Sequence, residues 1–113
     1  MGNEIKVGEY CRTSAGKIFK CSEIVLGNIP KDENKTMIVT YIVKHSSNLI
    51  DLIQCGDYVN GKEVTEIKEW NSSKDGYFRY AVTCHYEIIR ADEIKTIVTK
   101  EMMESISYKV ERN

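Results

Sequence analysis

Cysteine and histidine are the residue types of this chain that could act as nucleophile and base, and Cys84 and His85 are adjacent. A catalytic pair needs its thiol and imidazole within hydrogen-bond reach. Residues 78–88 place apolar side chains at even positions, which predicts a long β-strand with one buried face. Neighbours in a strand point to opposite faces, so these two side chains cannot pair with each other. We expect Cys84 to be a core thiol and His85 to face solvent, and we assign no catalytic residue.

Metal-binding and phosphate-binding patterns are not found in the sequence either. The two histidines lie far apart, and the four cysteines, at positions 11, 21, 55 and 84, include no closely spaced pair of the kind that holds structural zinc. Gly16-Lys17 and Gly61-Lys62 lack the longer glycine-rich loop that wraps a phosphate. We therefore expect no metal, no cofactor and no enzymatic activity.

Two stretches of the sequence share one pattern. Residues 8–24 and 56–67 each contain Gly, an acid and Tyr, then Gly-Lys, then Glu-Ile. Asn60-Gly61 suits a type I′ turn, in which both central residues take positive φ. Val64 and Ile67 are three residues apart, which breaks strict alternation and predicts a β-bulge. The pattern predicts a twisted β-hairpin used twice, and chance similarity of turn residues is the alternative explanation.

Other strands are predicted around these hairpins. Residues 36–44 are rich in β-branched side chains and predict a strand that is covered on both faces. A tight turn at Asp92-Glu93 should pair residues 77–90 with residues 94–98 as an antiparallel hairpin. The cluster of turn-forming residues at 71–76 predicts a further turn.

Helix is predicted only in short connectors. Residues 46–53 and 99–105 each begin with Ser or Thr, which can cap a helical turn or two. Beyond the second connector, Ile106, Tyr108 and Val110 alternate with polar residues and predict a last strand.

The composition predicts one folded domain over residues 1–113. The chain has 113 residues, 42% of them hydrophobic, which suits a single core. Two hairpins and a few further strands would leave open sheet edges unless the sheet curls. We predict an all-β, β-dominated fold, an SH3-like curled small barrel of about five to seven strands with two short helical connectors.

Charge and hydropathy limit the partners and the location. Lys and Arg total 16 against 17 for Asp and Glu, so no net field draws the molecule to nucleic acid or to an anionic membrane. The first ten residues lack the apolar segment of a secretory signal, and no apolar run approaches the ~20 residues that span a bilayer. We expect a cytoplasmic protein with no membrane partner.

The segment GDYVNGKEVTEI, residues 56–67, resembles the first hairpin of SH3-like small barrels, including the KOW type. More broadly, VGEYCRT, KHSSNLIDLIQCGDYVNGKEV and IKTIVTKEMMESISYKV resemble, over nearly the whole chain, a group of small proteins encoded by phages and prophages of Firmicutes. This resemblance implies a β-rich accessory protein of a mobile element, in the cytoplasm of an infected or lysogenic bacterial host. It carries no active site to transfer.

The function favoured by exclusion and by this resemblance is non-enzymatic binding and inhibition of a host protein, such as a CRISPR effector or another bacterial defence component. Trp70, Tyr77 and Phe78 bracket the predicted turn at 71–76 and are the expected anchors if that hairpin protrudes, because aromatic residues dominate interface hot spots. The alternative is that Trp70 closes one end of the barrel against the core.

The alternative function is a nucleic-acid-binding module of the KOW kind. Barrel closure would gather five basic residues of the repeated hairpins, with a tyrosine as stacking face. These five are Arg12, Lys17, Lys20, Lys62 and Lys68. Acidic residues are interleaved with them, and they oppose phosphate binding.

Overall fold

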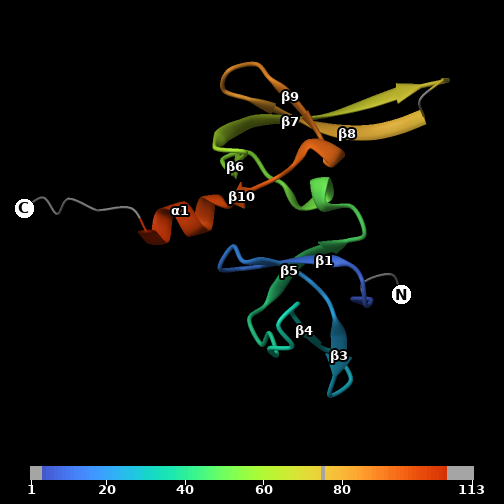
Figure 1. Cartoon of the computed structure of the whole chain (residues 1–113), viewed down its shortest axis with the longest axis vertical. Coiled ribbons are helices and arrows are strands. Elements are labelled where there is room, and N and C mark those ends of the chain that lie inside the picture. The colour runs from blue at the N-terminus through green and yellow to red at the C-terminus, as the bar shows by residue number, and fades with distance from the viewer. Residues whose placement is uncertain (1–3, 75, 107–113) are drawn as a thin grey trace, which may run out of the picture.

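The computed structural model describes residues 4–74 and 76–106 and consists mainly of short antiparallel strands (Figure 1). A three-stranded sheet, in the order β2-β1-β5, contains β1 (Tyr10–Thr13), β2 (Ile18–Lys20) and β5 (Ile42–Ser46). β3 (Glu23–Val25) and β4 (Ile29–Lys31) form a separate hairpin. A five-stranded sheet, in the order β10-β6-β7-β8-β9, contains β6 (Tyr58–Val59), β7 (Lys62–Ser72), β8 (Gly76–Thr83), β9 (Ile88–Arg90) and β10 (Ile97–Val98). The all-β prediction is confirmed.

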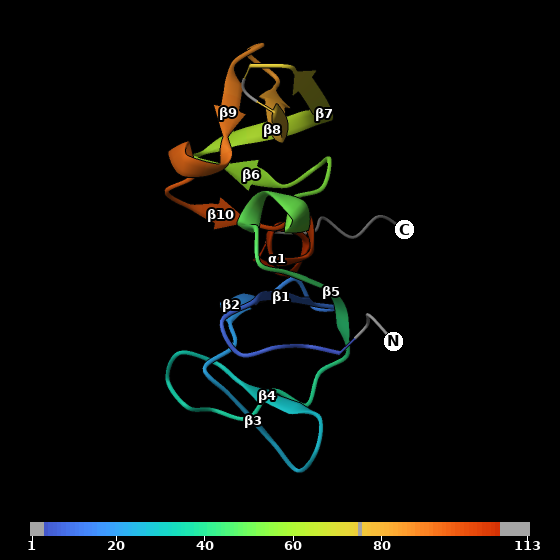
Figure 2. The same ribbon diagram turned by 90° about the vertical axis from the view of Figure 1, so that its right-hand side faces the viewer.

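The strands are arranged in two lobes, each with its own hydrophobic cluster. The N-terminal lobe (β1 to β5) packs Cys11, Phe19, Cys21 and Ile38 together. The C-terminal lobe (η1 and β6 to β10) packs Ile50, Ile53, Val59, Val64, Ala81 and Ile89 together. Figure 2 shows the lobes one above the other, with the C-terminal helix between them. The SH3-like single barrel is not confirmed, because the described strands form separate sheets around two clusters.

Both copies of the repeated sequence form hairpins, β1–β2 and β6–β7. In the second copy Asn60 has φ of 53° and Gly61 has φ of 83°, as the predicted type I′ turn requires. The predicted bulge is also present, because the pairing of β7 with β8 shifts register between Val64 and Glu66. The bulge allows both Val64 and Ile67 to face the C-terminal cluster.

The turn before each hairpin has the same hydrogen bonds in both copies. We call residues 6–9 and 54–57 the acidic turns. In each turn the backbone amide of the acid, the last residue, donates a hydrogen bond to the carbonyl of the first residue (3.1 Å in both). The amide of the first residue donates to the carboxylate of the acid, at 2.8 Å in residues 6–9 and 2.7 Å in residues 54–57. The amide of the glycine before the acid donates to the carbonyl of a residue in the following hairpin region, Cys21 in the first copy (2.8 Å) and Val64 in the second (2.9 Å). The amide of that same residue donates to the backbone carbonyl of the acid (2.8 Å in both). The sequence repeat is therefore a structural repeat.

The long strand predicted over residues 78–88 is wrong at its C-terminal end. β8 ends at Thr83, whose hydroxyl oxygen accepts hydrogen bonds from the amides of His85 (3.3 Å) and Glu87 (3.2 Å). With Tyr86 at a φ of 62°, the chain reverses into β9, which pairs back onto β8. Cys84 is therefore exposed in this turn and is not the predicted core thiol, while His85 is exposed as expected.

The strand predicted over residues 36–44 is shifted and covered on one face only. β5 spans Ile42–Ser46 and, among the described strands, pairs only with β1, so it forms one edge of its sheet. Ile38 and Ile42 pack against the N-terminal cluster. The alternate side chains, Val39, Tyr41 and Val43, are exposed, because no element within residues 4–74 and 76–106 covers that side.

The hairpin predicted at Asp92-Glu93 is also wrong. Residues Ala91–Glu93 form the 3₁₀ turn η2, and β10 pairs with β6 instead of β9. The side chain of Asn60 directs this crossing, because its amide oxygen accepts hydrogen bonds from the backbone of Lys95 (2.8 Å) and Thr96 (3.1 Å).

Both predicted helical connectors are present. The 3₁₀ helix η1 spans Leu49–Leu52, and α1 spans Lys100–Ile106 after Thr99, whose hydroxyl accepts a hydrogen bond from the Met102 amide (3.3 Å). Ile106 is the last residue of α1 and does not begin a strand, and Tyr108 and Val110 lie outside the described residues. No helix in the described part of the chain is long and apolar enough to cross a membrane.

Candidate functional site

The β7–β8 hairpin projects beyond the rest of its sheet (Figure 1). β7 pairs with β8 along the whole of β8, from Val64 opposite Thr83 to Ser72 opposite Gly76. β9 pairs with β8 only at residues 80–82. The predicted turn at 71–76 is confirmed, and the hairpin that it closes protrudes.

The three aromatic residues predicted as anchors lie on this projecting part. Trp70 is 51% exposed and Tyr77 is 58% exposed, while Phe78 is half-buried. Trp70 and Phe78 are cross-strand partners, so they share one face of the hairpin. Tyr77 lies opposite Asn71 on the other face. With half of its surface in solvent, Trp70 does not close a barrel end.

The face that carries Trp70 and Phe78 is both aromatic and basic. Tyr80 lies between Lys68 on β7 and Arg90 on β9 in one cross-strand row. The guanidinium of Arg90 lies over the Phe78 ring, 4.4 Å from its centroid, and the Phe78 and Tyr80 ring centroids are 6.1 Å apart. We call Lys68, Trp70, Phe78, Tyr80 and Arg90 the outer face.

A cleft of about 400 Å³ lies beside the hairpin. Its walls are residues 77–79 of β8, residues 90–92 of β9 and η2, and Asn48, Ile50 and Asp51 at η1. Two of the three predicted anchors therefore line a concave site. A volume of this size lies within the ~300–1,000 Å³ range of ligand pockets.

The two arginines of the cleft differ in their partners. Arg79 is 3.3 Å from both Asp51 and Glu69, and it also donates to the Tyr77 hydroxyl (3.3 Å). The Tyr77 contact and the two carboxylates raise the pKa of Arg79. Arg90 has no carboxylate within ion-pair distance among the described residues. Its charge is therefore open to a binding partner.

The five basic residues predicted for nucleic-acid binding are not brought together. Lys17 lies in the N-terminal lobe, 2.9 Å from Asp32, and Lys20 lies over the Tyr10 ring at 5.6 Å. In the C-terminal lobe Lys62 pairs with Glu87, and Lys68 is 4.0 Å from Glu66. Only Lys68 belongs to the outer face.

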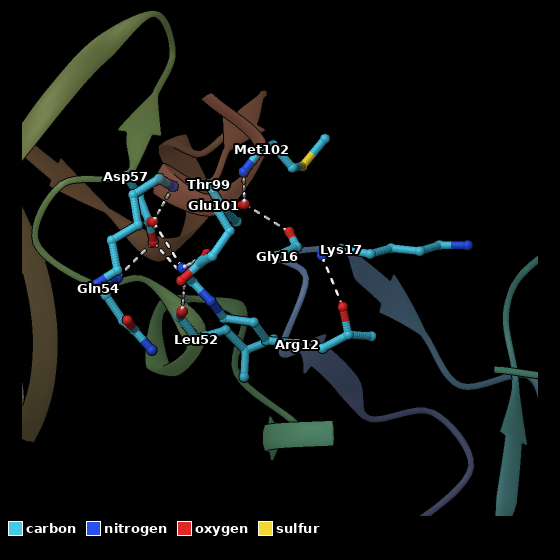
Figure 3. Close-up of polar contacts among 11 residues, drawn as sticks. Arg12, Gly16, Lys17, Leu52, Gln54, Asp57, Thr99, Glu101 and Met102 are labelled. Atoms are coloured by element: carbon cyan, nitrogen blue, oxygen red, sulfur yellow. Dashed lines mark hydrogen bonds and ion pairs between the residues drawn. The ribbon is translucent and has the colours of Figure 1, made fainter. Parts of the chain in front are cut away.

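Arg12, the fifth of these residues, is fully buried where the lobes meet (Figure 3). Its guanidinium donates to both oxygens of Asp57 (2.5 and 2.9 Å), to Glu101 (2.6 Å) and to the Leu52 carbonyl (2.9 Å). Burial alone would lower the pKa of Arg12, but the Asp57 and Glu101 carboxylates raise it. Arg12 therefore holds the lobes together and cannot reach a phosphate.

Further contacts complete this junction, which we call the Arg12 joint (Arg12, Asp57, Thr99 and Glu101). The Asp57 carboxylate also accepts hydrogen bonds from the amides of Gln54 (2.7 Å) and Lys100 (2.9 Å). The Thr99 hydroxyl donates to the carbonyl of Gly16 (2.8 Å), in the β1–β2 turn. Figure 3 shows segments from both lobes and the start of α1 meeting here.

One cysteine–histidine arrangement was missed by the sequence analysis, because its members are distant in sequence. Cys11 and His45 are cross-strand partners, and His45 Nδ1 is 2.9 Å from a carboxylate oxygen of Glu9. Burial, with smaller contributions from Cys21 and Glu9, raises the pKa of Cys11 to about 12. A fully buried thiol that stays protonated is not a nucleophile. In the described ranges, no three His, Cys, Asp or Glu side chains are arranged to hold a metal.

Sequence reasoning also missed Tyr80 and Arg90 as members of the outer face. The alternating pattern places Tyr80 on a buried face, and only the turn between β8 and β9 brings Arg90 beside it. Comparison of the chain with models of protein families, with curated proteins and with solved structures gives no match.

Proposed function

We propose that this protein is a non-enzymatic binding protein that holds a partner protein against the β7–β8 hairpin. The observation that supports this most directly is that Trp70 and Tyr77 are about half exposed on a projecting hairpin beside a 400 Å³ cleft. Large aromatic side chains left in water around a concave site are typical of interaction surfaces. Arg79 is ion-paired at the cleft, and the described residues that line it include no Cys, His or Ser that could act as a nucleophile with its base.

The proposed partner is a host protein of an infected or lysogenic bacterium. This part of the proposal rests on the resemblance of the sequence to phage and prophage proteins. A small protein without catalytic groups can act on such a host by covering a functional surface of a larger protein. The proposed target is a defence component, with a CRISPR effector as the specific candidate.

The test measures phage plaque formation on a host whose CRISPR system targets that phage. Expression of this protein should restore plaques, and the purified protein should bind the effector. Trp70→Ala should weaken binding more than tenfold, because a buried interface Trp contributes about 2 kcal/mol or more. Tyr41→Ala is the matched control, since Tyr41 is 74% exposed but lies in the N-terminal lobe.

The outcome that contradicts the proposal is also specific. Equal loss of binding by Trp70→Ala and Tyr41→Ala would show that the hairpin is not the contact. A large drop in melting temperature for Trp70→Ala would show that the ring supports the fold instead of a partner.

Single-stranded nucleic acid is the second candidate partner, supported by the row Lys68–Tyr80–Arg90 on the outer face. Aromatic rings flanked by cations are the common chemistry of single-strand binding. Glu66 next to Lys68 reduces the local positive charge. Fluorescence anisotropy with an oligothymidylate separates the candidates, because nucleic-acid binding must fall steeply as salt rises.

A further inference from the structure

The edge of β8 is only partly covered. β7 pairs with one side of β8 along its whole length, but β9 pairs with the other side only at Tyr80, Ala81 and Val82. No described strand pairs with that side of residues 76–79. The chain leaves the sheet after β9 in the turn η2, where Glu93 accepts a hydrogen bond from the Arg90 amide (2.8 Å).

The direction of the backbone groups on this edge follows from two hydrogen bonds. The Thr83 amide donates to the Glu87 carbonyl on the β9 side (2.9 Å), and the Cys84 amide donates to the Glu63 carbonyl on the β7 side (2.9 Å). Backbone groups alternate along a strand, so odd residues of β8 face the β9 side. The N–H and C=O groups of Tyr77 and the N–H group of Arg79 therefore point toward the uncovered edge, whereas the Arg79 carbonyl lies opposite Ala91, next to the Tyr80–Arg90 pair.

The 400 Å³ cleft lies along this same edge. Residues 77–79 form one wall, and residues 90–92, where β9 turns away, form the end. The space next to the edge is thus open where a longer β9 would have continued. An unpaired edge with a cleft beside it is suited to strand addition, in which a peptide backbone completes the hydrogen bonds.

We propose that this slot accepts an extended segment of the partner protein as a strand added to β8, with a carboxylate of that segment held by Arg90. The inference rests on the proposed function and specifies the form of its partner.

Two observations define the chemistry of that segment. Arg79 is already neutralised by Asp51 and Glu69, whereas Arg90 has no carboxylate partner in the described part of the chain. The contact with the Phe78 ring restrains the position of the Arg90 guanidinium, whose planar fork suits two-point binding of a carboxylate. The aromatic wall then suits an apolar side chain next to the acid. Alternating N–H and C=O groups match a peptide backbone and not a sugar–phosphate chain.

The first test measures amide hydrogen exchange by NMR. In the free protein the Phe78 and Tyr80 amides should exchange slowly because they face β7, and the Tyr77 and Arg79 amides should exchange fast. Binding of a peptide selected as in the second test should slow hydrogen exchange at the Tyr77 and Arg79 amides at least tenfold. Unchanged exchange at both amides in the bound state would overturn strand addition.

The second test uses a displayed library of linear peptides, selected on the full-length protein. Selected peptides should contain Asp or Glu beside an aromatic or aliphatic residue. Arg79→Pro removes one edge N–H without touching the β7 ladder, and Arg79→Val is its matched control because both variants lose the guanidinium. Arg79→Pro should bind these peptides about fivefold more weakly than Arg79→Val. Arg90→Gln should remove the preference of the protein for peptides that contain Asp or Glu.

The outcomes separate this inference from the proposed function. Peptides that lose binding with Trp70→Ala but bind Arg79→Pro and Arg79→Val equally would overturn strand addition and leave the hairpin as a binding surface. If the peptides bind Trp70→Ala as tightly as the unmodified protein, both the strand addition and the proposed function are overturned. Displacement of the peptides by an oligothymidylate, with steep salt dependence, would identify nucleic acid as the occupant and overturn the inference.

Discussion

The two acidic turns have the same backbone hydrogen bonds, yet their acids have different surroundings. Glu9, in the N-terminal lobe, is partly exposed and meets His45 at 2.9 Å. Asp57, in the C-terminal lobe, is fully buried and holds Arg12, the side chain that comes from the other copy of the hairpin. The acid of the first turn therefore lies near the surface, while the acid of the second turn lies at the centre of the Arg12 joint.

This difference shows that local sequence determines the turn and tertiary contacts determine its role. The glycines of the two turns have nearly the same conformation, with φ of 96° at Gly8 and 98° at Gly56. The residues two positions after the two tyrosines also have different roles. Arg12 binds the Asp57 carboxylate across the lobes, and Asn60 binds the chain that leads into β10. The two copies therefore share a backbone conformation, while their side chains make different contacts.

The largest expected effect comes from breaking the buried acid. Asp57→Ala should lower the free energy of unfolding by about 3–5 kcal/mol, because it leaves Arg12 charged, buried and without its main partner. Glu9→Ala should cost about 1 kcal/mol, since its contacts are partly hydrated. Urea unfolding of both variants measures the difference.

A double variant checks the cause of that loss. Arg12→Met with Asp57→Leu removes both charges and should be less destabilised than Asp57→Ala alone, because no unpaired charge remains buried. Equal costs for Asp57→Ala and Glu9→Ala would mean that the Arg12 joint does not stabilise the contact between lobes.

A smaller effect is expected from two glycines of the first hairpin. A Cβ on Gly16 would lie 2.2 Å from the Thr99 hydroxyl oxygen, whereas a Cβ on Gly8 would meet nothing within 4 Å. Both glycines have positive φ, so each alanine variant should lose about 1 kcal/mol to backbone strain. Gly16→Ala should lose about 2 kcal/mol more, because the clash disrupts the Thr99 contact with the β1–β2 turn. Thermal unfolding compares the two, and equal melting temperatures would contradict a close contact between Thr99 and that turn.

The sequence allowed correct prediction of features with local causes. The Asn60-Gly61 turn, the bulge after Val64 and the Thr99 cap each depend on a few adjacent residues. The turn at 71–76 was predicted for the same reason, whereas the projection of its hairpin was only a condition for Trp70 and Tyr77 to act as anchors. Turn-forming residues constrain the backbone wherever they occur.

Features set by contacts distant in sequence were not predicted. Arg12 was assigned to a basic surface because its charge is visible in the sequence, while its burial depends on Asp57 and Glu101. Cys84 fits the apolar alternation of β8, but the Thr83 hydroxyl stabilises a turn that ends the strand just before it. Arg90 joins the outer face only after that turn.

The smallest expected effect concerns acid sensitivity in the N-terminal lobe. Burial alone would raise the pKa of Glu9, but hydrogen bonding to the Lys6 amide and to His45 lowers it overall. The Lys17 ammonium, together with the Thr36 and Asn34 amides, lowers the pKa of Asp32. Each carboxylate therefore binds its proton at lower pH in the folded state than in the unfolded state. Their stabilisation is complete above the unfolded pKa values and is lost as pH falls through the folded ones.

Urea unfolding from about pH 6 down to about pH 2.5 measures this loss. The free energy of unfolding should fall across the acid range, because the unfolded chain binds more protons there. Glu9→Gln with Asp32→Asn should start from a lower stability at pH 6 and show a shallower decline. A decline as steep as that of the unmodified protein would place the acid-sensitive groups outside these two N-terminal contacts.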